Sequence, residues 1–221
     1  MAGKLGARGG TLESRLFYVP VLNRGWLVAG RAFPYTSRPM EHRLHIYYGY
    51  GKGKTTSSVG LLIRTAGAGQ KAALVQFDKG FDGVNEHYSE RKILRTLPNL
   101  QLFPFGKERV LGPNAFRFKN IEGDFAEAQA ALAQARELIT QGDQNLLVLD
   151  EILAAVMVKL VSREEVMDLI ELYNRNRRCE LVITGHQVWP ELVEKADLVT
   201  EMRKEKHYFD QKSPSKEGIE F

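Results

Sequence analysis

The chain has 221 residues, 43% of them apolar, so it can bury one sizeable core and is expected to form one main globular domain. Residues 1–39 carry a net charge of +5, which leaves −1 for residues 40–221 out of a whole-chain charge of +4. The part expected to fold is therefore not basic, which argues against nucleic acid as a partner.

Cysteine content and hydropathy further limit the classes of protein to which the chain can belong. The single cysteine, Cys179, excludes an internal disulfide and a cysteine-rich metal site, which fits a reducing compartment. No apolar run approaches the roughly 20 residues of a membrane span. We therefore expect a cytoplasmic protein with no membrane partner.

The N-terminal 39 residues are rich in glycine and arginine and show no long amphipathic period. Their composition is compatible with an organelle transit peptide, with a disordered arm, or with sequence upstream of a true start at Met40. We favour the last two, because Met40 lies just ahead of the first strand-like run. The expected organisation is a disordered extension over 1–39 and a single domain over 40–221.

From residue 43 onward, apolar runs alternate with segments of helical spacing. The predicted strands are 43–48, 72–77, 100–105, 145–149, 180–183 and 198–202, and the predicted helices are 55–68, 85–97, 124–141, 162–173 and 189–195. This alternation predicts an α/β fold of the P-loop NTPase type, with a mainly parallel sheet and helices on both faces. Residues 106–120 form a long aperiodic loop, which favours a functional role, and residues 204–221 form a polar tail.

A glycine-rich turn follows the first predicted strand and opens a predicted helix. It consists of Gly49, Tyr50, Gly51, Lys52, Gly53, Lys54, Thr55 and Thr56. Such a turn points backbone N–H groups at an anion, while the lysine adds charge and the threonine hydroxyl can hold Mg²⁺. The usual G-x-x-x-x-G-K-[ST] pattern would place its first glycine at Tyr48, so this loop is one residue short unless Gly49 takes that role. The alternative to a phosphate-binding loop is a tight turn that happens to be glycine-rich.

A second signal is the buried run that ends in Asp150 and Glu151. It matches the Walker B pattern, which brings a carboxylate to the end of a strand beside the phosphate loop, although acids also favour the starts of helices. His186 follows the end of another predicted strand and is a candidate ligand contact. Phe116 and Phe118 lie in the long loop, where they either pin it to the domain or contact a ligand.

These motifs together resemble one family. They are GYGKGKTT at 49–56, QFDKG at 76–80, VLDE at 148–151, TG at 184–185, ADLVTEM at 196–202, KH at 206–207 and the terminal GIEF at 218–221. In order and spacing, from about position 43 to the last residue, the chain resembles the P-loop ATP:corrinoid adenosyltransferases. In that family a loop one residue short is the usual form.

The resemblance implies transfer of the 5′-deoxyadenosyl group of ATP to the Co(I) of a corrinoid such as cob(I)alamin, with release of triphosphate. Co(I) is itself the nucleophile, which agrees with the lack of a candidate serine, cysteine or histidine nucleophile in the chain. By resemblance, Lys52 and Lys54 neutralise phosphates, and Thr55 and Glu151 bind Mg²⁺. Asp150 either binds the metal directly or contacts its ligands. The resemblance also implies a homodimer served by a reduced flavoprotein.

Two positions depart from the family pattern. The family typically has Phe-x-Trp in the loop before the long helix, where its rings remove an axial ligand from cobalt; here the corresponding residues are Phe116 and Phe118. Family members often have arginine after Thr-Gly, and here it is His186. Two rival functions therefore stay open: a P-loop kinase or ATPase with another substrate, and a non-catalytic regulator that binds nucleotide or corrinoid.

Overall fold

The computed structural model describes residues 27–28, 31–32, 41–80, 86–112, 115–211 and 213–221. The chain divides into two compact units, residues 1–40 and residues 41–221. In the first unit, β1 (Leu27–Val28) and β2 (Arg31–Ala32) pair antiparallel, a pairing the sequence did not predict. The remainder of the predicted disordered extension lies outside the described residues.

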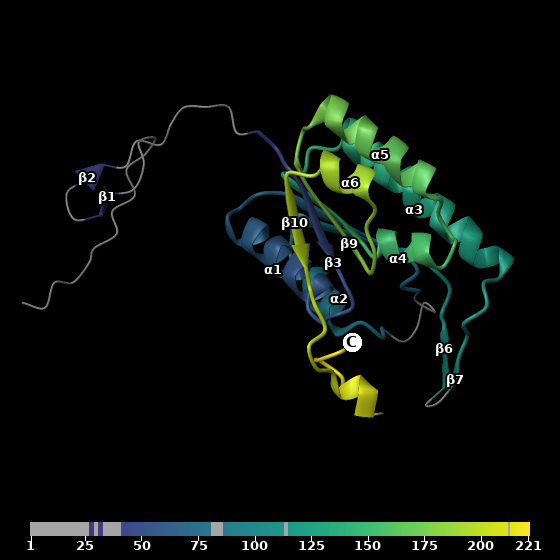
Figure 1. Cartoon of the computed structure of the whole chain (residues 1–221). Helices are drawn as coiled ribbons and strands as arrows, with labels where there is room; N and C mark the ends of the chain where they lie inside the picture. The colour runs from purple at the N-terminus through teal and green to yellow at the C-terminus, as the bar shows by residue number, and fades with distance from the viewer. Residues whose placement is uncertain (1–26, 29–30, 33–40, 81–85, 113–114, 212) are drawn as a thin grey trace, which may run out of the picture. The chain divides into compact units, whose positions relative to one another are not determined.

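The second unit is built on a six-stranded sheet with the order β10-β3-β9-β8-β4-β5, in which every neighbouring pair is parallel (Figure 1). The strands are β3 (Leu44–Tyr48), β4 (Ala72–Gln76), β5 (Leu100–Pro104), β8 (Leu146–Asp150), β9 (Glu180–Gly185) and β10 (Leu198–Glu201). Strands β4 and β8 are buried along their whole length, as expected for apolar strands covered on both faces.

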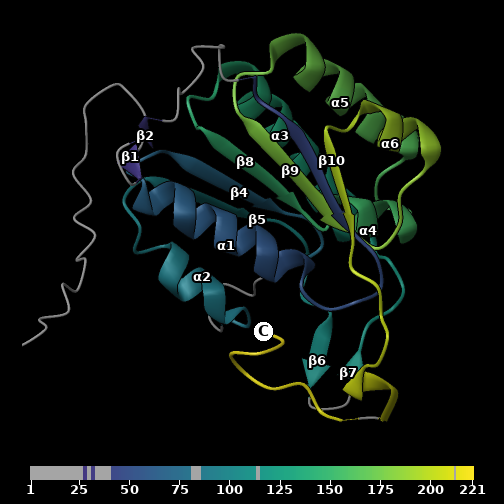
Figure 2. The same ribbon diagram turned by 60° about the vertical axis from the view of Figure 1, so that its left-hand side comes forward.

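Helices cover both faces of the sheet, so the predicted α/β class is confirmed (Figure 2). They are α1 (Lys54–Gly67), α2 (Ser89–Leu94), α3 (Glu122–Gln141), α4 (Ile152–Met157), α5 (Arg163–Asn176) and α6 (Pro190–Lys195). Leu62 of α1 and Leu94 of α2 belong to the core on one face. Leu132 of α3, Leu169 of α5 and Leu192 of α6 belong to the core on the other.

The structure corrects several details of the sequence interpretation. Of the helix predicted over 85–97, the described residues 86–97 form only α2, where Ile93 is 60% exposed and Arg91 is fully buried. Phe125, an apolar residue of the helix predicted over 124–141, is 45% exposed. Helix α4 was not predicted.

The loop and the tail that were predicted as irregular also contain structure. Residues 106–120 include an antiparallel hairpin of β6 (Val110–Gly112) and β7 (Ala115–Phe116). The polar tail contains a short 3₁₀ helix, Tyr208–Gln211. Within the described part of the chain, no helix combines the length and the apolar character needed to cross a bilayer.

Candidate functional site

The glycine-rich loop links β3 to α1 at the carboxyl edge of the sheet, as predicted. Gly53 caps α1 with φ 121° and Gly49 has φ 115°, backbone conformations that side chains disfavour. The Gly51 N–H donates to the carbonyl of Met202, just past β10, at 2.6 Å. A Cβ at Gly49 or Gly51 would lie 2.5 Å from that same oxygen. Close backbone packing therefore requires glycine at both positions, whatever the loop binds.

A cavity of about 690 Å³ opens over the start of α1. Its size is in the range of ligand-binding pockets. From the predicted phosphate loop it is lined by Lys52, Gly53, Lys54, Thr55 and Thr56. Other lining residues come from distant parts of the chain and include Lys79, Glu151 and the C-terminal stretch 218–221. The structure thus brings Lys54, Thr55 and Glu151 together around one space.

Lys54 is the buried cation of this cavity. Its side chain is only 7% exposed, and its Nζ donates to the carbonyl of Gly51 at 2.9 Å. Burial lowers the pKa of its ammonium, while Glu151 and Asp150 act in the opposite direction. At the N-terminus of the 14-residue α1, this charge adds to the positive end of the helix dipole. The arrangement suits a polyanion such as a nucleotide phosphate chain.

Asp150, at the end of β8, is fully buried beneath the loop. Its oxygens accept hydrogen bonds from Thr55 Oγ1 at 3.0 Å, from Thr184 Oγ1 at 2.7 Å and from Lys79 Nζ at 2.6 Å. Gln76 Nε2 adds a weaker contact at 3.3 Å. The carboxylate therefore joins the ends of β4, β8 and β9 to the first turn of α1.

The ion pair between Lys79 and Asp150 governs the protonation of both groups. Burial opposes charge on each of them, but their mutual attraction and hydrogen bonds outweigh it. The pKa of Asp150 is consequently held below its ordinary value, and that of Lys79 is raised. Both groups are charged at neutral pH.

Glu151 has a strained backbone, with φ 64° in the left-handed region, and its N–H donates to Thr184 Oγ1 at 2.8 Å. Non-glycine residues in this conformation concentrate at functional sites. The turn leaves Glu151 lining the cavity beside Thr55. A carboxylate and a hydroxyl next to phosphate oxygens form a donor set that Mg²⁺ accepts. Glu151 and Thr55 therefore fit this ion, whereas the oxygens of Asp150 are already occupied by four donors.

His186 does not line the cavity. Its ring stacks on Tyr50 at a centroid distance of 5.4 Å, and Gln187 Nε2 donates to the Tyr50 hydroxyl at 2.6 Å. These contacts support the outer side of the glycine loop. Tyr50 is thus a loop residue that does not line the cavity, and His186 lies beside it.

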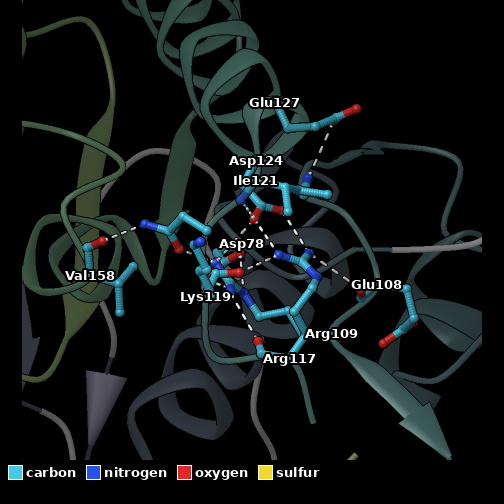
Figure 3. Close-up of polar contacts among 11 residues, drawn as sticks. Asp78, Glu108, Arg109, Arg117, Lys119, Ile121, Asp124, Glu127 and Val158 are labelled. Atoms are coloured by element: carbon cyan, nitrogen blue, oxygen red, sulfur yellow. Dashed lines mark hydrogen bonds and ion pairs between the residues drawn. The ribbon is translucent and has the colours of Figure 1, made fainter.

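The hairpin of β6 and β7 is anchored by a network of charged residues at its base (Figure 3). Arg117 Nη2 donates to Asp124 Oδ1 at 2.8 Å, and Arg109 Nε donates to both oxygens of Asp78 at 2.8 Å. Asn120, which accepts from Arg109, donates to the carbonyl of Val158 at the end of α4. Hydrogen bonding to Arg117 lowers the pKa of Asp124, which is itself buried.

This network bears on the two predicted aromatic residues. Phe118 is 84% exposed and follows directly after Arg117, so its ring is displayed rather than packed into the core. Phe116 ends β7, and its side chain lies outside the described part of the structure. Because Asp78 is the neighbour of Lys79 in sequence, the network connects the hairpin to Lys79 in the cavity wall.

The sequence interpretation assigned no role to Gln76, Lys79 or Thr184, although the motifs that contain them were noted. All three follow or end parallel strands, whose carboxyl ends meet at one edge of the sheet. Polar residues at the ends of otherwise apolar strands are therefore the signal that finds them.

An all-parallel sheet whose glycine loop opens a helix beside a buried strand-end carboxylate defines an α/β protein of the P-loop NTPase type. Residues 41–221 match the family model described as ATP:corrinoid adenosyltransferase BtuR/CobO/CobP. The chain belongs to this ATP:corrinoid adenosyltransferase family.

Individual relatives agree with the family match. The chain is 31% identical to a corrinoid adenosyltransferase from Pseudomonas aeruginosa over 179 residues, which cover 80% of this chain and 83% of the relative. It is 29% identical over 178 residues to the corrinoid adenosyltransferases of Escherichia coli K12 and Salmonella typhimurium, covering 80% of this chain and 84% of each relative. The similarity thus spans most of this chain and most of each relative.

Proposed function

We propose that the chain transfers the 5′-deoxyadenosyl group of ATP to the Co(I) centre of a corrinoid and releases triphosphate. The observation that carries this proposal is a one-residue-short glycine loop whose Lys54 and Thr55 line a cavity, in a chain that matches the adenosyltransferase family over residues 41–221. The electron pair of Co(I) attacks the 5′ carbon, the bond from that carbon to the triphosphate oxygen breaks, and the triphosphate leaves with the bonding pair. Cobalt gives up two electrons to the new cobalt–carbon bond and becomes Co(III).

The protein's part in this reaction is to bind, orient and stabilise charge. Co(I) has no proton to lose, so no general base is required. The only cysteine fits this picture, because burial raises the pKa of Cys179 to about 11 and keeps it a thiol. Lys54 and the start of α1 are proposed to hold the phosphates and stabilise the charge that develops on the departing triphosphate.

We further propose Mg²⁺ as the cofactor, held by Glu151 and Thr55 together with phosphate oxygens. The ion would supply additional stabilisation of charge on the leaving group. Asp150 is proposed to orient the Thr55 hydroxyl through their 3.0 Å hydrogen bond instead of binding the ion itself. A homodimer, a reduced flavoprotein as the electron donor and a cytoplasmic location are proposed on the family resemblance and the sequence composition alone.

Phe116 and Phe118 are proposed to pack against the corrinoid and displace its axial ligand, which makes Co(II) easier to reduce. The 84% exposure of Phe118, two residues after β7, supports this role, because an exposed aromatic ring offers apolar surface that a corrinoid can cover.

Changing Phe116 and Phe118 together to alanine is expected to lower turnover that starts from Co(II) by at least about tenfold. A tenfold loss corresponds to about 1.4 kcal/mol of activation free energy, which the loss of ring packing can account for. Turnover that starts from chemically prepared Co(I) should fall much less. Phe125→Ala is the matched control, since that ring is also exposed but lies on α3. Equal losses from Co(II) and Co(I) would contradict the proposed role.

The proposed function is tested by incubating the chain with ATP, Mg²⁺ and cob(I)alamin and recording the corrinoid absorption spectrum. Conversion to the adenosylated form is expected. A kinase or ATPase would consume ATP without changing the spectrum. A regulator would bind its ligand and turn over neither substrate.

A further inference from the structure

The C-terminal residues form a wall of the nucleotide cavity. Gly218, Ile219, Glu220 and Phe221 line the same space as Lys54 and Thr55. In Figures 1 and 2 the C-terminal end of the chain lies beside α2, below the carboxyl edge of the sheet. The polar tail is therefore part of the site and not a peripheral extension.

The tail holds the glycine loop through Lys52. The Nζ of Lys52 donates to the Ile219 carbonyl at 2.6 Å and to Glu220 Oε1 at 3.1 Å. The carboxylate of Glu220 also accepts from the Tyr208 hydroxyl and, at 2.6 Å, from the Lys216 backbone N–H. Glu220 thus ties the 3₁₀ helix, the terminal turn and the glycine loop to one point.

A ring contact fixes the end of the chain on the opposite wall. The Phe221 ring stacks on His87 at a centroid distance of 4.3 Å and an interplanar angle of 9°. Lys92 of α2 also pairs with Glu217 at 3.4 Å, but both side chains are more than half exposed and neither residue lines the cavity. The tail therefore spans from the glycine loop to the segment around α2.

The charges indicate what Glu220 does. Hydrogen bonding from Tyr208 and Lys216 lowers the pKa of Glu220 to about 2, so it is ionised at neutral pH. The charge of Lys52 is consequently matched by Glu220, and a phosphate chain would be met mainly by Lys54 and the α1 dipole. A partly exposed ion pair adds little to stability in itself, so its main effect is on where the loop lies.

We propose that the C-terminal segment 218–221 is part of the nucleotide site, and that Glu220 is a positioning residue that fixes the glycine loop through Lys52 for triphosphate binding. The identity of the ligand as ATP rests on the proposed function. Lys52 then acts by holding the loop in place, and its role differs from that of Lys54.

The proposal is tested with Glu220→Ala and with a chain that ends after Glu217. The control is Glu217→Ala, which removes the same charge from the same tail but breaks only the exposed pair with Lys92. Binding of Mg-ATP is measured by calorimetry without corrinoid, and KM for ATP and for corrinoid is measured separately.

Both test variants are expected to raise the Kd for ATP roughly tenfold, the effect of losing a charge-assisted hydrogen bond. In both test variants the KM for corrinoid and the unfolding temperature should change little. The Glu217→Ala control should keep the Kd for ATP of the unmodified chain. In the full chain, saturating ATP is expected to slow the release of Phe221 by carboxypeptidase.

ATP binding within twofold of the unmodified chain in both test variants, or tighter binding, would overturn the proposal. Should truncation prevent folding, Glu220→Ala decides alone. A full chain that binds ATP but adenosylates no corrinoid would defeat the proposed function and leave this test valid. A full chain that binds no ATP would defeat both.

Discussion

Replacing Asp150 by asparagine is expected to lower the free energy of unfolding by about 3–5 kcal/mol, the usual cost of breaking a buried ion pair. The substitution preserves shape but leaves the Lys79 ammonium, whose side chain is 13% exposed, without its counter-charge. All four groups around the Asp150 carboxylate donate to it in the unmodified chain, so the N–H₂ of asparagine would face at least one other donor. Thermal and urea unfolding measure the loss, and adenosyl transfer should fall with it because Thr55 is no longer oriented.

The matched control is Asp143→Asn, which removes an aspartate paired with Lys71 at the surface, where both side chains are more than half exposed. Such a pair contributes about 0–1 kcal/mol. The double variant Asp150→Asn with Lys79→Met should recover part of the lost stability but not the activity, since it removes the uncompensated charge. A stability loss for Asp150→Asn no larger than that of the control would contradict the central place of this carboxylate.

The second large effect is expected from Lys54→Met. This variant keeps a long apolar side chain in the buried position but removes the ammonium proposed to stabilise the departing triphosphate. Removing one such preorganised donor typically costs about 10²–10³ in turnover. We expect a loss of that order in kcat/KM with a folded chain, because burial already works against the charge of Lys54.

Lys195→Met is the control for Lys54, since this partly exposed lysine pairs with Glu171 on α5 and does not line the cavity. Its kinetics should match those of the unmodified chain. Steady-state rates with varied ATP separate an effect on binding from one on chemistry. A Lys54→Met enzyme that retained a third or more of its kcat/KM would show that the loop does not act through this charge.

Much of the site could be predicted from the sequence because its parts lie in local patterns. The glycine loop joins a strand to a helix, and Asp150 ends an apolar strand that Glu151 directly follows. The structure brings Lys54, Thr55 and Glu151 to one cavity. The wall formed by the C-terminal tail could not be predicted in this way. Its contact between Lys52 and Glu220 spans 168 positions, and nothing in the polar tail indicates a partner so distant.

The errors in the fold have a similar origin. Helix α2 turns Arg91 inward, where its guanidinium donates to Gln76 Oε1 at 2.6 Å, and Ile93 outward. A buried polar partner thus overrode the apolar pattern on which the prediction depended. Helix α4 was missed because residues 152–157 are apolar all round and follow directly after the Walker B acids, so no period marks them.

The most direct test of the central claim is the identity of the phosphate product. ATP, Mg²⁺, cob(I)alamin and the chain are incubated, and the products are followed by phosphorus NMR alongside the corrinoid spectrum. We expect one triphosphate to be released for each adenosylated corrinoid formed, with neither ADP nor orthophosphate as the initial product. ADP or orthophosphate released while the corrinoid stays unmodified would contradict the central claim.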